Sequence, residues 1–182
     1  MNPKKVAVLI VAALALSAVA FVQEPQDPRQ LPKPLVTFRG EFSKVDETRY
    51  LRVTDAETWA TLWCEHTGQQ AQKRGYGWYY NQQQVPIVDF ERCMVVAVFG
   101  GKCGNTAGYR VEQVLDGDRW TLRYHANSYQ TTVIDPANAK AKPPSTPFGM
   151  FVLPKTDKKV ALEENVQGMI GRPPKWRLQA TL

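Results

Sequence analysis

The strongest structural signal in the sequence is MVVAVFGG, residues 94–101. Six consecutive apolar side chains, three of them valine, are typical of a strand that is buried in a protein core. The paired glycines end the run, and the glycine-rich link over residues 102–108 allows the chain to reverse. We therefore expect another strand to begin at Tyr109.

Before this strand, the sequence predicts a single helix. Residues 54–57, TDAE, form a capping box in which we expect Thr54 to cap the helix, with its acidic residue at the favourable end of the helix dipole. Apolar residues then recur at helical spacing up to Trp63, and Gly68 is a natural stop. The pattern predicts one capped helix over residues 55–66.

The rest of the pattern indicates strands. Tyr109, Val111 and Leu115 are expected to share one face of a strand, and a turn at residues 116–117, DG, leads into its antiparallel neighbour. Several antiparallel strands with one helix predict an α+β fold, either a mainly antiparallel β-sheet or a sandwich, with the helix on one side. The expected strands are residues 35–45, 49–53, 94–99, 109–115, 120–126, 148–153, 160–162 and 176–182.

The N-terminus resembles a targeting segment. Lys4 and Lys5 precede an unbroken apolar stretch over residues 6–16, and Ala18 and Ala20 stand where a signal peptidase expects small side chains. We expect residues 1–20 to be a signal peptide cleaved near Ala20, which predicts export to a periplasmic or extracellular space. An uncleaved N-terminal anchor is the alternative, although the apolar stretch is only marginally long enough to span a bilayer.

Composition divides the remaining chain into two parts. Residues 21–34 combine four prolines with polar side chains and predict an extended leader, whereas residues 35–182 have the size of a single domain. The chain has a formal net charge of +6, and its densest basic patch is expected to be solvated. We expect no nucleic acid as a partner, and no membrane after the signal peptide is cleaved. That patch comprises Lys140, Lys142, Lys155, Lys158 and Lys159.

The residues carry little reaction chemistry. There are two histidines: His66 is expected to complement the helix dipole as a cation, and His125 to lie on the polar face of a strand. A zinc site built from these histidines with Cys64 and Cys103 matches no known ligand spacing, and Gly-x-Ser-x-Gly does not occur. We predict a protein that is not an enzyme and that needs no metal or cofactor.

Three cysteines occur in the sequence, at positions 64, 93 and 103. Export permits a disulfide, and an odd number leaves one thiol over. Cys93 and Cys103 flank a strand about 20 Å long, beyond disulfide reach unless the loop folds back sharply. Cys64 with Cys93 is therefore the predicted pair, and three buried thiols are the alternative.

A glutamine-rich segment, residues 69–86, has no core periodicity and predicts a long surface loop. Its aromatic cluster, Tyr76, Trp78, Tyr79 and Tyr80, is a candidate contact surface because aromatic side chains anchor interfaces at low entropic cost. The alternative is a lid that folds back over the sheet. A glycan-binding module using this cluster is a further possibility that no motif supports.

Short motifs recur through most of the chain after residue 35: Trp59, Leu62 and Trp63, VDF at 88–90, residues 94–100, AGY at 107–109, Pro147-Phe148 and VLPK at 152–155. Together they resemble the C-terminal domain of the PrcB family, which is named for a protease-complex subunit. The resemblance implies an exported accessory domain with no active site of its own, which binds another protein, a secreted protease in the founding type. The loop at 69–86 and the cysteines depart from the family pattern.

Two loops carry a second resemblance: GNTAGY, residues 104–109, and RPPKW, residues 172–176. They are similar to the Asn-Pro-Thr-Thr-Gly-Tyr and Arg-Pro-Trp loops of the chagasin-type inhibitors of cysteine proteases. This alternative implies that a loop enters a protease cleft. The contact residues that it implies are Asn105, Thr106, Gly108 and Tyr109.

Overall fold

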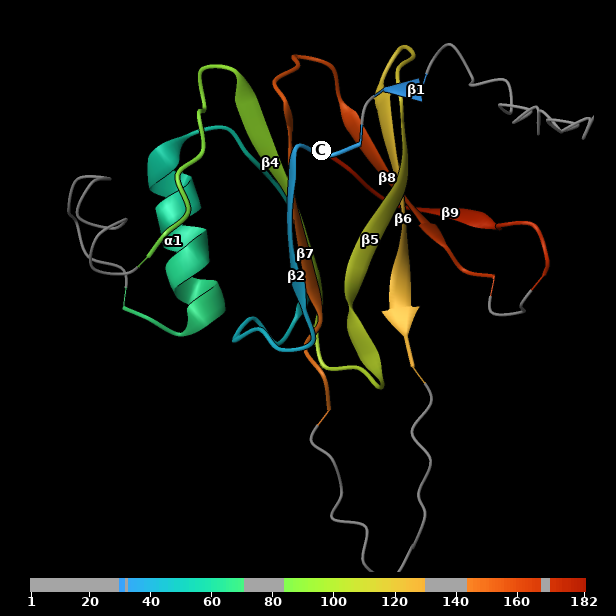
Figure 1. Ribbon diagram of the computed structural model, residues 1–182, viewed down its shortest axis with the longest axis horizontal. Helices are drawn as coiled ribbons and strands as arrows, with labels where there is room; N and C mark the ends of the chain where they lie inside the picture. Colours follow the sequence, from blue (N-terminus) through green and yellow to red (C-terminus); the bar gives the residue numbers. More distant parts are fainter. Residues whose placement is uncertain (1–29, 32, 71–83, 130–143, 168–170) are drawn as a thin grey trace, which may run out of the picture.

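The computed structural model describes residues 30–31, 33–70, 84–129, 144–167 and 171–182. It shows three layers: a helix, a four-stranded sheet and a five-stranded sheet (Figure 1). The chain is an α+β protein made mostly of antiparallel strands, with one helix in the described ranges, which confirms the predicted fold class. The predicted signal peptide and the aromatic cluster at 76–80 lie outside the described residues.

The middle layer is the four-stranded antiparallel sheet, in the order β2-β7-β4-β3. β4 is buried on both faces, which explains why its sequence carries no polar residue. One face contacts the helix layer through Val95, Ala97 and Phe99, and the other contacts the second sheet through Met94, Val96 and Val98. The strands are β2 (Val36–Gly40), β3 (Thr48–Val53), β4 (Cys93–Gly100) and β7 (Phe148–Pro154).

The helix α1 (Ala56–Thr67) covers the outer face of this sheet (Figure 1). Its N-cap is Asp55, whose carboxylate accepts a hydrogen bond from the Thr58 backbone N–H at 2.8 Å, so the predicted cap at Thr54 is wrong by one residue. Gly68 ends the helix at φ 74°, as predicted. Within the described ranges no helix is long and apolar enough to cross a membrane.

The third layer is the five-stranded sheet, in the order β1-β5-β6-β8-β9. β6 and β8 run parallel, which the local pattern does not reveal because the chain visits the other sheet between them. Its inner face packs against β4 and β7 to form the second hydrophobic core. The strands are β1 (Gln30–Leu31), β5 (Thr106–Leu115), β6 (Trp120–Ser128), β8 (Val160–Asn165) and β9 (Trp176–Thr181).

Two details of this sheet differ from expectation. β5 shifts register between Val111 and Gln113, so Val114 takes the buried position expected for Leu115. The predicted leader also contains β1, whose Leu31 pairs with Val114 and packs against the core between the sheets. The contact of Leu31 with the core therefore holds the end of the segment at 21–34, which the prolines in the sequence predicted to be an extended leader.

Candidate functional site

The segment that resembles the inhibitor loop is mostly built into β5. Thr106 and Tyr109 are only 6% and 7% exposed, and Tyr109 packs edge-to-face on Tyr124. Gly108 is buried where β5 approaches β2 and β7 most closely. Asn105 remains at the surface, with φ 39° and its carbonyl accepting from the Tyr129 N–H at 3.0 Å. Of the four predicted contact residues, only Asn105 is exposed to a partner.

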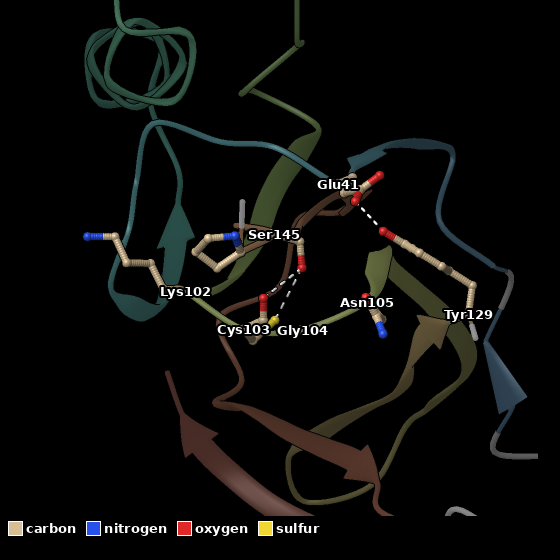
Figure 2. A pocket seen from close by; sticks show the side chains of 8 residues that line it. Glu41, Lys102, Cys103, Gly104, Asn105, Tyr129 and Ser145 are labelled. Carbon is tan, nitrogen blue, oxygen red and sulfur yellow. Dashed lines mark hydrogen bonds between the residues drawn. The ribbon is translucent and has the colours of Figure 1, made fainter. Parts of the chain in front are cut away.

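A cavity of about 410 Å³ opens beside this segment (Figure 2). The Tyr129 hydroxyl donates to the Glu41 carboxylate on one side of it, and Ser145 Oγ donates to the Cys103 carbonyl at 3.1 Å on the other. The Cys103 Sγ lies 3.7 Å from the same Ser145 Oγ. Among the described residues, the Cys103 side chain and carbonyl contact the Ser145 hydroxyl, whereas the Glu41 carboxylate in the same cavity accepts from Tyr129.

A second polar cluster lies at the end of the helix. His66 Nδ1 is 2.9 Å from Ser43 Oγ, which resembles a nucleophile with its base. Ser43 Oγ, however, also accepts a hydrogen bond from the Val45 N–H at 3.0 Å. The Ser43 N–H donates to the Thr146 hydroxyl, and that hydroxyl donates to the Ser43 carbonyl. These bonds fasten the segment before β3 to the helix end, which is a structural role.

The His66 ring is 8% exposed and packs against the rings of Phe148, Trp63 and Phe99, with its centroid 4.0 Å from that of Phe148. Burial lowers the pKa of His66 below its ordinary value. The neutral imidazole is therefore favoured, and the cationic role expected for His66 at the helix end is wrong. The sequence places His66 on the helix but does not show the ring covered by aromatic side chains.

Acid should therefore weaken the fold through His66. The folded protein binds the proton less readily than the unfolded chain, so this contribution to the free energy of unfolding is complete above pH 6.5 and decreases as the pH falls through that value. The slope contributed by one group is at most about 1.4 kcal/mol per pH unit. Urea denaturation at pH values from about 7.5 to about 5.5 measures this slope, because the interval extends roughly one pH unit on either side of the ordinary imidazole pKa of about 6.5.

His125 supplies the matched control, because it is the other of the two histidines and lies half-buried on β6, with its Nδ1 2.8 Å from the Glu112 carboxylate. His66→Gln should remove most of the pH dependence, and His125→Gln should retain it. Glu164, whose pKa burial raises, acts in the opposite direction at lower pH and is common to all variants. An identical slope in both histidine variants would contradict the assignment to His66.

No disulfide joins Cys64 to Cys93 in the structure, and the predicted pairing stays a prediction for the oxidised protein. Cys64, Cys93 and Cys103 are all thiols in the structure. The helix does pack beside β4 as the prediction required, since Cys93 contacts the core cluster that contains Cys64. Burial raises the pKa of the Cys64 thiol, which disfavours the thiolate that disulfide formation needs. Within the described ranges no group of three His, Cys, Asp or Glu side chains is placed to hold a metal ion.

The surface around β2 is unusual in a different way. Leu35, Val36 and Phe42, here called the β2 strip, are 60%, 46% and 54% exposed. A cavity of about 370 Å³ lies between β2 and β5, on the face of β2 opposite Val36. Its lining residues are Lys33, Pro34, Thr37, Arg39, Arg110 and Val111. The sequence places Thr37 and Arg39 two residues apart on a strand, but only the packing of the two sheets brings Arg110 beside them.

Comparison with known proteins identifies no family for this chain. It matches no protein-family model, no curated protein and no solved structure. A functional proposal therefore rests on the surfaces described above and on the resemblances in the sequence.

Proposed function

We propose that this protein is an exported, non-catalytic accessory domain that binds another protein, with a secreted protease as the first partner to test. The observation that carries the proposal is the β2 strip. Three of the five exposed large apolar side chains found among the described residues lie in this one segment. Single exposed apolar residues are ordinary, but several in one segment indicate a contact surface.

Two features of the sequence support the same function. The N-terminal targeting signal favours export, and the resemblance to the PrcB family favours an accessory role beside a protease. A protein–protein interface of ordinary size covers about 800 Å² on each partner, with an apolar centre and a polar rim. The β2 strip supplies apolar side chains for such a centre, and the cationic side chains of Lys33, Arg39 and Arg110 supply part of a rim.

The non-catalytic part of the proposal rests on the two clusters that come nearest to reaction chemistry. The Cys103 thiol contacts the Ser145 hydroxyl, and the Ser43 hydroxyl accepts a backbone N–H as well as contacting His66. We expect the purified protein to hydrolyse none of a panel of peptide, ester and glycoside substrates. Turnover that disappears in Ser43→Ala or Cys103→Ser, while the fold is retained, would overturn this part.

Binding should depend on the β2 strip. A photo-cross-linking side chain at position 36 captures the partner in the exported fraction of the native host, and the partner is then purified for titration. Val36→Asp should weaken the measured affinity by about tenfold or more, because a carboxylate in a desolvated interface centre has no partner. Leu178→Asp should change it less than about twofold, because Leu178 is 51% exposed on β9, in the other sheet.

Two results would contradict the proposal. Equal loss of affinity in Val36→Asp and Leu178→Asp would show that the strip is not the contact surface. A protein that sediments as a dimer, and that Val36→Asp converts to a monomer, would assign the strip to a second copy of the chain. Thermal denaturation of both variants confirms that each remains folded.

A further inference from the structure

The cavity between β2 and β5 gathers positive charge from three separate parts of the chain. Lys33 precedes β2, Arg39 lies on β2 and Arg110 lies on β5. All three side chains are exposed. Thr37 adds a hydroxyl, and Pro34 and Val111 add apolar walls. The cavity is therefore cationic with a partly apolar lining.

Several basic residues elsewhere on the surface have acidic partners. Arg123 pairs with Glu163 at 2.9 Å, Lys102 with Asp46 at 2.7 Å and Lys158 with Asp116 at 2.6 Å. In the described part of the chain, by contrast, no side chain or carbonyl forms an ion pair or hydrogen bond with the three cations of the cavity. Three like charges around one cavity repel each other, and an anion placed among them relieves that repulsion.

The donor groups specify the anion. A guanidinium presents a planar fork of N–H groups that matches the two oxygens of a carboxylate or phosphate, and the ammonium of Lys33 adds a point charge. The apolar groups narrow the choice further, since Pro34 and Val111 line the cavity and the exposed Leu35 follows Pro34 in the chain. A free inorganic ion makes no use of such neighbours, whereas a peptide with acidic and apolar side chains uses both.

We infer that the cavity binds the carboxylates of an acidic segment of the protein partner, whose apolar side chains cover the apolar walls of the cavity and the neighbouring Leu35. The inference rests on the proposed function, because it gives the chemical character of the partner's contact segment. Recognition at the cavity is electrostatic, so association of the partner should weaken as the salt concentration rises.

The test uses a fluorescein-labelled octapeptide of alternating glutamate and leucine, titrated by fluorescence anisotropy at low ionic strength. The double variant Arg39→Gln/Arg110→Gln should bind it about tenfold or more weakly than the unchanged protein, because two charge-assisted contacts are lost. The control Lys155→Gln/Lys159→Gln removes the same charge from exposed positions outside the cavity and should weaken binding by less than about twofold. Both variants change exposed side chains, and circular dichroism confirms that they fold.

Three outcomes would overturn the inference. Equal weakening in the two double variants would show an effect of net charge alone. Equal affinity for the peptide with glutamine in place of glutamate would show that the apolar side chains suffice. Displacement of the peptide by inorganic phosphate at an equal concentration would assign the cavity to a free oxyanion instead of a protein segment.

The partner itself separates failure of this inference from failure of the proposed function. If Val36→Asp weakens binding of the cross-linked partner and Arg39→Gln/Arg110→Gln does not, the cavity has no part in recognition and the proposed function stands. If no partner is captured at all, yet the acidic peptide binds in an arginine-dependent manner, the cavity is an acidic-peptide site and the proposed function fails.

Discussion

Gly108→Ala should lower the free energy of unfolding by about 2–5 kcal/mol. Gly108 has φ +99°, a conformation that an alanine adopts at a cost of about 1–2 kcal/mol. A Cβ at this position also lies 2.8 Å from both the Gly40 N and the Phe148 O atoms. These are backbone atoms of β2 and β7, so the overlap is relieved only by moving the sheets apart, which adds the cost of overpacking.

Two other glycines divide this cost into its parts. Gly171 has φ +79° with nothing within 4 Å of an added Cβ, so Gly171→Ala should lose only the conformational part, about 1–2 kcal/mol. Gly104 has open space and no positive φ, so Gly104→Ala should be close to neutral. Urea denaturation of the three variants gives the comparison. Equal losses at positions 108 and 171 would mean that the close approach of the strands does not constrain the fold.

Trp59→Ala should lower the free energy of unfolding by about 3–5 kcal/mol, the usual cost of removing a large aromatic side chain from a core. Trp59 is fully buried between the helix and the middle sheet, with its ring 6.0 Å from Phe38 and 5.4 Å from Trp63. Its indole N–H donates to the Pro86 carbonyl at 2.8 Å, which ties the segment before β4 to the helix. Loss of the ring leaves a cavity in this layer and breaks that tie.

Smaller changes separate packing from hydrogen bonding. Trp59→Phe keeps most of the ring and loses the N–H donor, so it should cost about 1–2 kcal/mol. Trp176→Ala tests a partly exposed tryptophan, which lies under the Arg123 guanidinium at 5.2 Å, and should cost about 1 kcal/mol. Calorimetric or urea unfolding of the three variants measures these differences. A Trp59→Ala loss no larger than that of Trp176→Ala would contradict the placement of Trp59 in the core.

The features that the sequence predicts best depend on neighbours along the chain. The run from Met94 to Phe99 is apolar throughout because each face of β4 meets a different layer, and the unbroken run alone identifies it as buried. Gly68 ends the helix because glycine readily adopts the left-handed conformation found there, and the residue type alone predicts this. The helix start is less certain from sequence, because Thr54 and Asp55 are both good caps and only the geometry selects Asp55.

The features that the sequence misses depend on contacts between distant segments. A register shift in β5 replaces Leu115 with Val114 in the core, and no local pattern marks that bulge. The cationic cavity joins Arg39 to Arg110 only because β2 and β5 lie side by side in different sheets. Burial of His66 likewise comes from Phe148, a residue far along the chain. Function is hardest to read for the same reason, because the candidate surface is assembled by the packing.

The position of β7 has a consequence for how this chain folds. β7 lies between β2 and β4 in the middle sheet, although both of those strands precede it in the sequence by many residues. Until Phe148–Pro154 is in place, β2 has no hydrogen-bonded neighbour and β4 has one open edge. β8 then returns to the other sheet and pairs with β6. Neither sheet is therefore complete in any N-terminal fragment that stops before β7, and native structure should be gained in one late, cooperative step.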